Sequence, residues 1–183
     1  MTLSLAALLA ACGGSAKPST SPTTPAGPTT TAAGHVAKPA SNVASVSAKM
    51  ICESEAENEI YQSATGVKTV APFKPKWVDH VYSCDYVYPG GAKMTLAVKE
   101  LSNEAETTAY FDSLATKLGK TDKPVGIPNA FQVPDGSVVV RKDFKVMLVD
   151  VTKLPASFGV PPASKGDVAI NVAATIMGCW TGA

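Results

Sequence analysis

Apolar residues recur every four positions in the segment 47–64, at Cys52, Ala56, Ile60 and Ala64. On an α-helix this spacing places the four side chains in one stripe along a single face. The glutamates between them fall largely on the other faces. The pattern therefore predicts one amphipathic helix over the whole segment, with the stripe buried and the acidic side in water.

Two further segments have helical patterns. In the segment 103–118, Asn103 and Glu106 match a capping box at the start of a helix. The apolar stripe of this segment comprises Phe111, Leu114, Ala115 and Leu118. The segment 165–179 is apolar almost all round, which predicts a final helix that is buried on more than one side.

Alternating patterns predict a β-hairpin between the first two helices. The segments 77–88 and 92–101 each place apolar residues at every second position, as strands with one buried side do. For these sides to share one face of the sheet, Cys84 must lie opposite Leu96 across a three-residue loop, 89–91. The two glycines of this loop suit a turn that requires positive φ.

Three more strands are predicted, over 129–133, 137–142 and 145–151. The last is almost entirely apolar, which favours a central position in the sheet. The elements follow the order α-β-β-α-β-β-β-α, and hairpin-linked strands interspersed with helices are typical of the α+β class. We therefore predict a single α+β domain over 47–183, with an antiparallel sheet of about five strands covered by three helices.

The N-terminus has a different pattern, because an apolar run over 3–11, interrupted only by Ser4, directly precedes Cys12. The run is shorter than the roughly 20 residues of a spanning helix and matches a signal-peptide core. The residues LAAC at 9–12 resemble the lipobox of bacterial lipoproteins. This resemblance implies that 1–11 is a cleaved signal peptide, and that lipidated Cys12 anchors the protein on the outer face of the cell membrane. Residues 1–4 contain no Lys or Arg, which departs from the usual export signal.

Residues 12–46 link this cysteine to the predicted domain. After Cys12 they contain neither acidic nor aromatic residues, and Pro, Ser, Thr, Ala and Gly dominate. Such a segment cannot bury a hydrophobic core. We predict a flexible tether with a root-mean-square span of roughly 30 to 35 Å.

Three cysteines remain for the domain: Cys52, Cys84 and Cys179. Disulfides are common in exported proteins, and three thiols allow one intramolecular bridge. Cys52–Cys84 is favoured, because both residues lie on predicted inward faces and the first helix must pack on the hairpin. Cys52–Cys179, which would join the first and last helices, is the alternative.

Four segments together resemble a group of actinobacterial cell-envelope lipoproteins whose function is not established. They are AKMICESE at 48–55, WVDHVYSCDY at 77–86, VVVRKDFKVMLVDV at 138–151 and GCWTG at 178–182. A helix cysteine followed by a strand Cys-Asp-Tyr is also loosely similar to extracytoplasmic sensor-type domains, in which a helix–strand disulfide occurs. Neither resemblance implies a catalytic motif, a cofactor or a metal ligand.

The sequence contains few residues suited to catalysis. The formal net charge is +1 and only 17% of residues are charged, so no nucleic-acid surface is indicated. The motifs GxSxG, HExxH, GxGxxG, CxxC and the P-loop are absent, and the chain has 2 histidines. We therefore predict no catalytic residue, no metal site and no cofactor.

Aromatic residues around the first hairpin form the one candidate binding site. They are Trp77, Tyr82, Tyr86 and Tyr88. They belong either to the core and its rim or to an aromatic-lined groove for an apolar or glycan ligand. We expect a membrane-anchored, non-enzymatic module that binds an envelope ligand or a protein partner. The alternatives are a hydrolase or thiol enzyme that uses Cys179 or Cys84, and a purely structural accessory subunit of undetermined oligomeric state.

Overall fold

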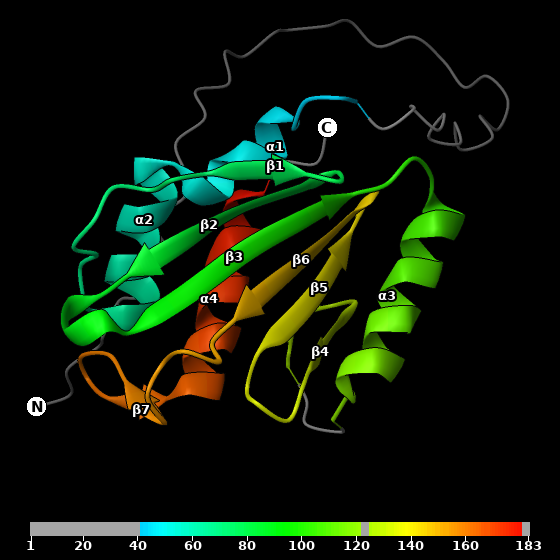
Figure 1. Ribbon diagram of the computed structural model, residues 1–183. Coiled ribbons are helices and arrows are strands. Elements are labelled where there is room, and N and C mark those ends of the chain that lie inside the picture. Colours follow the sequence, from blue (N-terminus) through cyan, green and yellow to red (C-terminus); the bar gives the residue numbers. More distant parts are fainter. Residues whose placement is uncertain (1–40, 122–124, 181–183) are drawn as a thin grey trace, which may run out of the picture. The chain divides into compact units, whose positions relative to one another are not determined.

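The structure of the protein, a computed structural model, describes residues 41–121 and 125–180. The expected signal peptide (1–11), Cys12 and the tether up to residue 40 lie outside the described residues. The described part has the predicted α+β class. The strands of its main sheet are β1 Lys76–Val78, β2 Val81–Val87, β3 Lys93–Glu100, β4 Ala130–Gln132, β5 Val138–Lys142 and β6 Lys145–Asp150. They follow the order β1-β2-β3-β6-β5-β4, and every neighbouring pair is antiparallel (Figure 1).

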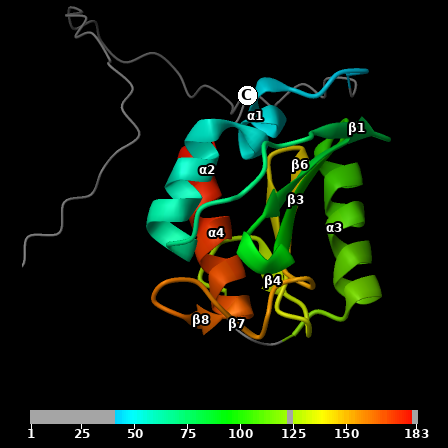
Figure 2. The same cartoon turned by 60° about the vertical axis from the view of Figure 1, so that its left-hand side comes forward.

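Helices cover both faces of this sheet. They are α1 Val46–Lys49, α2 Ser54–Ile60, α3 Glu104–Leu118 and α4 Lys165–Cys179, and a two-stranded ribbon of β7 Ser157–Phe158 and β8 Ala163–Ser164 precedes α4. Figure 2 shows α2 and α4 on one side of the sheet and α3 on the other. As predicted, α4 is buried on more than one side, since it packs against β5 and β6 and also against α2.

Two clusters of buried side chains hold these layers together. The larger lies between the sheet and α1, α2 and α4. The smaller lies beneath α3, on strands β4 to β6 and the residue after β4, and comprises Phe131, Val133, Val139 and Val146. The predicted stripe of α3 packs on this smaller cluster. The predicted N-cap is also confirmed, because the Asn103 side chain accepts the backbone N–H of Glu106 at 2.9 Å.

The first hairpin has the predicted register. Cys84 lies opposite Leu96, and Tyr86 lies opposite Met94. The loop between the strands is the predicted one, and Gly90 within it has a positive φ of 75°. Strand β6 lies between β3 and β5, so its predicted central position is confirmed.

The prediction of one continuous helix over 47–64 is wrong. The chain is extended at Glu53 (φ −92°, ψ 157°), and a 3-10 turn, Met50–Cys52, separates α1 from α2. Contact with the sheet explains the interruption, because the carbonyl oxygen of Ile51 accepts a hydrogen bond from the hydroxyl of Tyr86 at 2.6 Å. The break therefore accounts for four α-helices where the pattern predicts three.

The predicted strand over 77–88 is also divided. Asp79 and His80 both have positive φ, 51° and 59°, and form a two-residue turn between β1 and β2. Aspartate and histidine tolerate this conformation better than most residues. The turn adds an edge strand, so the main sheet has six strands instead of about five.

Candidate functional site

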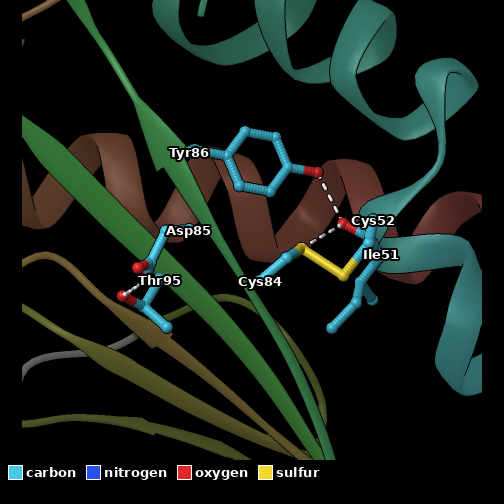
Figure 3. The surroundings of a disulfide bond; sticks show 6 residues. All are labelled: Ile51, Cys52, Cys84, Asp85, Tyr86 and Thr95. Atoms are coloured by element: carbon cyan, nitrogen blue, oxygen red, sulfur yellow. Dashed lines mark hydrogen bonds between the residues drawn. A yellow bond between two sulfur atoms is a disulfide. The ribbon is translucent and has the colours of Figure 1, made fainter. Parts of the chain in front are cut away.

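The disulfide joins the 3-10 turn to the sheet. Cys52 and Cys84 are bridged, with a Cα–Cα distance of 5.9 Å, so Cys52 is not joined to Cys179. Both half-cystines are buried, at 8% and 3% exposure. Figure 3 shows the neighbouring Tyr86, whose hydroxyl donates to the Ile51 carbonyl beside the bridge. The bridge and this hydrogen bond fix the start of α2 on β2.

The four aromatic residues of the first hairpin do not form one groove. Tyr86 and Tyr88 are buried in the core, at 0% and 1% exposure, so neither lines a surface. Trp77 and Tyr82 are partly exposed and lie opposite each other on β1 and β2. All four side chains point to the helix-covered face of the sheet, where Tyr86 and Tyr88 are buried in the larger core cluster. The expectation of a groove lined by all four is therefore wrong.

The buried tyrosines have structural roles. Burial raises the pKa of Tyr86 and of Tyr88 well above the ordinary value of 10.0. Tyr86 consequently stays protonated at any physiological pH, and its hydroxyl donates a hydrogen bond to the Ile51 carbonyl. Trp77 has a comparable role near the surface, since its indole N–H donates to the backbone oxygen of Asn42 at 2.9 Å.

The other face of the first hairpin is partly exposed to solvent. We call it the open sheet face. It consists of the outward-pointing residues around its centre on β2, β3 and β6, which are Ser83, Asp85, Lys93, Thr95, Ala97, Lys99, Leu148 and Asp150. Each of them is partly exposed. In contrast, Val139 and Val146, which also point to the α3 side of the sheet, are buried beneath that helix. Helix α3 thus covers β4, β5 and the start of β6 on this side of the sheet, and Leu148, which packs against the covered cluster, lies at the boundary (Figure 1).

A hydrogen-bonded polar cluster lies on the open sheet face. Asp85 accepts from Lys93 Nζ at 2.9 Å and from Thr95 Oγ1 at 2.7 Å. The hydrogen bond from Lys93 is the largest cause that lowers the pKa of Asp85, and the same bond raises the pKa of Lys93. Figure 3 shows Asp85 and Thr95 on the opposite side of β2 from Cys84 and Tyr86. The two carboxylate oxygens are therefore held in a defined position at the surface.

A row of small and apolar residues crosses the centre of the same face. Ser83 lies opposite Ala97, and Ala97 lies opposite Leu148 on the next strand. The charged residues Asp85 and Lys99 lie on either side of this row along their strands. The open sheet face therefore has a small and apolar centre with charged residues beside it.

Other kinds of site can be tested on the described residues. Within 41–121 and 125–180, no group of three or more His, Cys, Asp or Glu side chains is placed to hold a metal ion. No helix in those ranges has the length and apolar character to cross a membrane.

Comparison of the chain with protein-family models, with curated proteins and with solved structures yields no match.

Proposed function

We propose that the protein is a lipid-anchored, extracytoplasmic and non-enzymatic module that binds a protein partner through the open sheet face. The observation that carries this proposal is the partial exposure of a sheet face whose other half is covered by α3. The sequence 9–12, which resembles a lipobox, supports an anchor at Cys12.

The shape of the surface favours a protein over a small molecule. Small-molecule sites are concave, whereas protein contact surfaces are broad and comparatively flat. Three strands spaced about 4.8 Å apart and about 20 Å long give the open sheet face an area of roughly 300 Å². A stable complex buries about 800 Å² on each partner, so this contact is weak in solution.

Anchoring compensates for a weak contact. Two proteins held on one membrane meet at a high effective concentration, which raises the bound fraction without any new interaction. An anchor and a small open face therefore fit one function, a transient contact with another envelope protein.

Photo-crosslinking in the producing cells tests the surface. A p-benzoylphenylalanine residue replaces Ala97 in the centre of the open sheet face, and in the control it replaces Ala109 on α3, which is exposed. We expect a light-dependent adduct of defined mass from position 97 and none from position 109. Equal adducts from both positions, or none from position 97, would overturn the proposed surface.

The anchor is tested separately by metabolic labelling with a palmitate analogue. The wild-type chain should incorporate the label, and the Cys12→Ser variant should not. Labelling that persists in the variant, or that is absent from the wild type, would show that Cys12 is not the lipidation site.

A further inference from the structure

The described chain begins beside one end of the main sheet. We call this region the tether end and define it as the segments 41–50 and 74–81. The two segments are joined by the hydrogen bond from the Trp77 indole to Asn42, and Trp77 packs edge-on against His80 with ring centroids 5.7 Å apart. Both views of the fold show the first described residues next to the β1–β2 turn (Figures 1 and 2).

A buried carboxylate holds the first segment in place. Ser45 caps α1, and its backbone N–H and its hydroxyl both donate to the Glu100 carboxylate at the end of β3. Glu100 is 8% exposed, and its own N–H donates to the carbonyl oxygen of His80. The direction in which the chain enters the fold is therefore fixed by interactions with the sheet.

Apolar side chains are exposed at the tether end. Among the described residues, five large apolar side chains are exposed, and three of them lie here: Val43 at 64%, Val46 at 83% and Val78 at 62%. Each of these three valines is adjacent in the sequence to a residue of the hydrogen-bond network just described. The two segments also contain three lysines and one acidic residue, Asp79. Exposed valines, a partly exposed tryptophan and an excess of lysine suit the interface between lipid tails and anionic headgroups.

We propose that the tether end lies on the membrane surface, with the three valines inserted among the lipid headgroups. This inference rests on the lipid anchor of the proposed function. In the sequence, residues 13–40 join Cys12 to this end of the fold. The tether end is thus the part of the fold that the anchor keeps nearest to the bilayer, so even a weak affinity for lipid suffices.

Tryptophan fluorescence provides the test. The acylated full-length protein is incorporated into vesicles of phosphatidylglycerol and phosphatidylcholine, with or without bromine on the phosphatidylcholine tails. Bromine quenches only tryptophans that lie at the bilayer, and the second tryptophan, Trp180, is buried at 3% exposure. We expect quenching in the wild type and its loss in Trp77→Phe.

A matched pair of variants isolates the apolar contact. Val78→Asp should abolish most of the quenching, whereas Val70→Asp should leave it unchanged, because Val70 is equally exposed (61%) but bonds to the far end of β2 at Val87. Circular dichroism of both variants checks that the fold is retained. Equal effects of the two variants, or no quenching in the wild type, would overturn the inference.

Flotation of the same vesicles separates this inference from the anchor. Protein that floats with the vesicles without tryptophan quenching would overturn the contact and leave the anchor standing. Protein that does not float would overturn both.

Discussion

The disulfide between Cys52 and Cys84 should provide a large part of the stability of the fold. The bridge closes a loop across a sequence separation of 32. The chain-entropy relation for a loop of this length gives about 3.7 kcal/mol at 25 °C. Replacement of both buried half-cystines by alanine also removes two sulfur atoms from the core, which adds about 1 kcal/mol for the lost packing. The variant Cys52→Ala/Cys84→Ala should therefore lose about 4 to 5 kcal/mol, a large share of the 5–15 kcal/mol typical of a domain.

Urea denaturation followed by far-ultraviolet circular dichroism measures this loss. The double variant is used because a single substitution would leave a reactive thiol in the core. Cys179→Ala is the control for removing a thiol that is not part of the bridge. A loss below about 1 kcal/mol in the double variant, within the range of an ordinary substitution, would refute the reasoning that the bridge limits the unfolded chain.

Two further substitutions test local features of the fold. Gly66→Ala should lower the free energy of unfolding by at least about 3 kcal/mol, because Gly66 has a φ of 60° and a Cβ there would overlap a backbone carbonyl. Gly90→Ala should cost only about 1 to 2 kcal/mol, because Gly90 also has a positive φ but its Cβ would meet open space. Equal losses of stability in urea denaturation would contradict the steric argument. Asp85→Asn should cost less than about 1 kcal/mol at pH 7, because the Asp85 side chain is 42% exposed. The lowered pKa of Asp85 means that its contribution is complete above the ordinary value of 3.8 and is lost as the pH falls through the folded value, so the difference between variant and wild type should shrink in acid. A difference that grows in acid would contradict this.

Elements with a regular hydrophobic period, or with a clear helix N-cap, could be predicted from the sequence. The helix α4 has its predicted bounds, and the stripe and N-cap of α3 are as expected. The register of the first hairpin also follows from its pattern, since a shift by one residue would place Cys84 on the open face. In each case the local pattern and the tertiary packing favour the same conformation.

The two corrections to the predicted elements arise where tertiary contacts outweigh the local pattern. The stripe from Cys52 to Ala64 continues through Glu53 without a break, and only the hydrogen bond from Tyr86 and the packing on β2 interrupt the helix. At the β1–β2 turn, Asp79 and His80 adopt positive φ without a glycine to indicate it. A period-two pattern cannot distinguish a long strand from a tight hairpin when the turn residues themselves continue the alternation.

The residue types at the outward positions of the strands give a sequence signal for the open sheet face. The alternation of apolar and polar residues alone does not use this signal. The outward positions of the first hairpin include Ser83, Asp85 and Thr95, which are small or polar. The corresponding positions of the later strands include Val139 and Val146, which are apolar. This difference predicts that a helix covers only the later strands. It could not predict that α3 is the covering helix, because that depends on the crossover from β3 and on the order of the strands.

The two proposed surfaces together define an orientation on the membrane. Strand β2 starts at Val81, next to the tether end, and runs for seven residues to Val87, so it extends about 20 Å away from that end. If the tether end lies on lipid, the strands stand away from the bilayer and the open sheet face points sideways, parallel to the membrane plane. A surface in that position, within about 20 Å of the lipid, meets other membrane-bound proteins more readily than freely diffusing ones. The adduct formed at position 97 should therefore contain a membrane-associated partner, and a freely soluble partner would argue against this orientation.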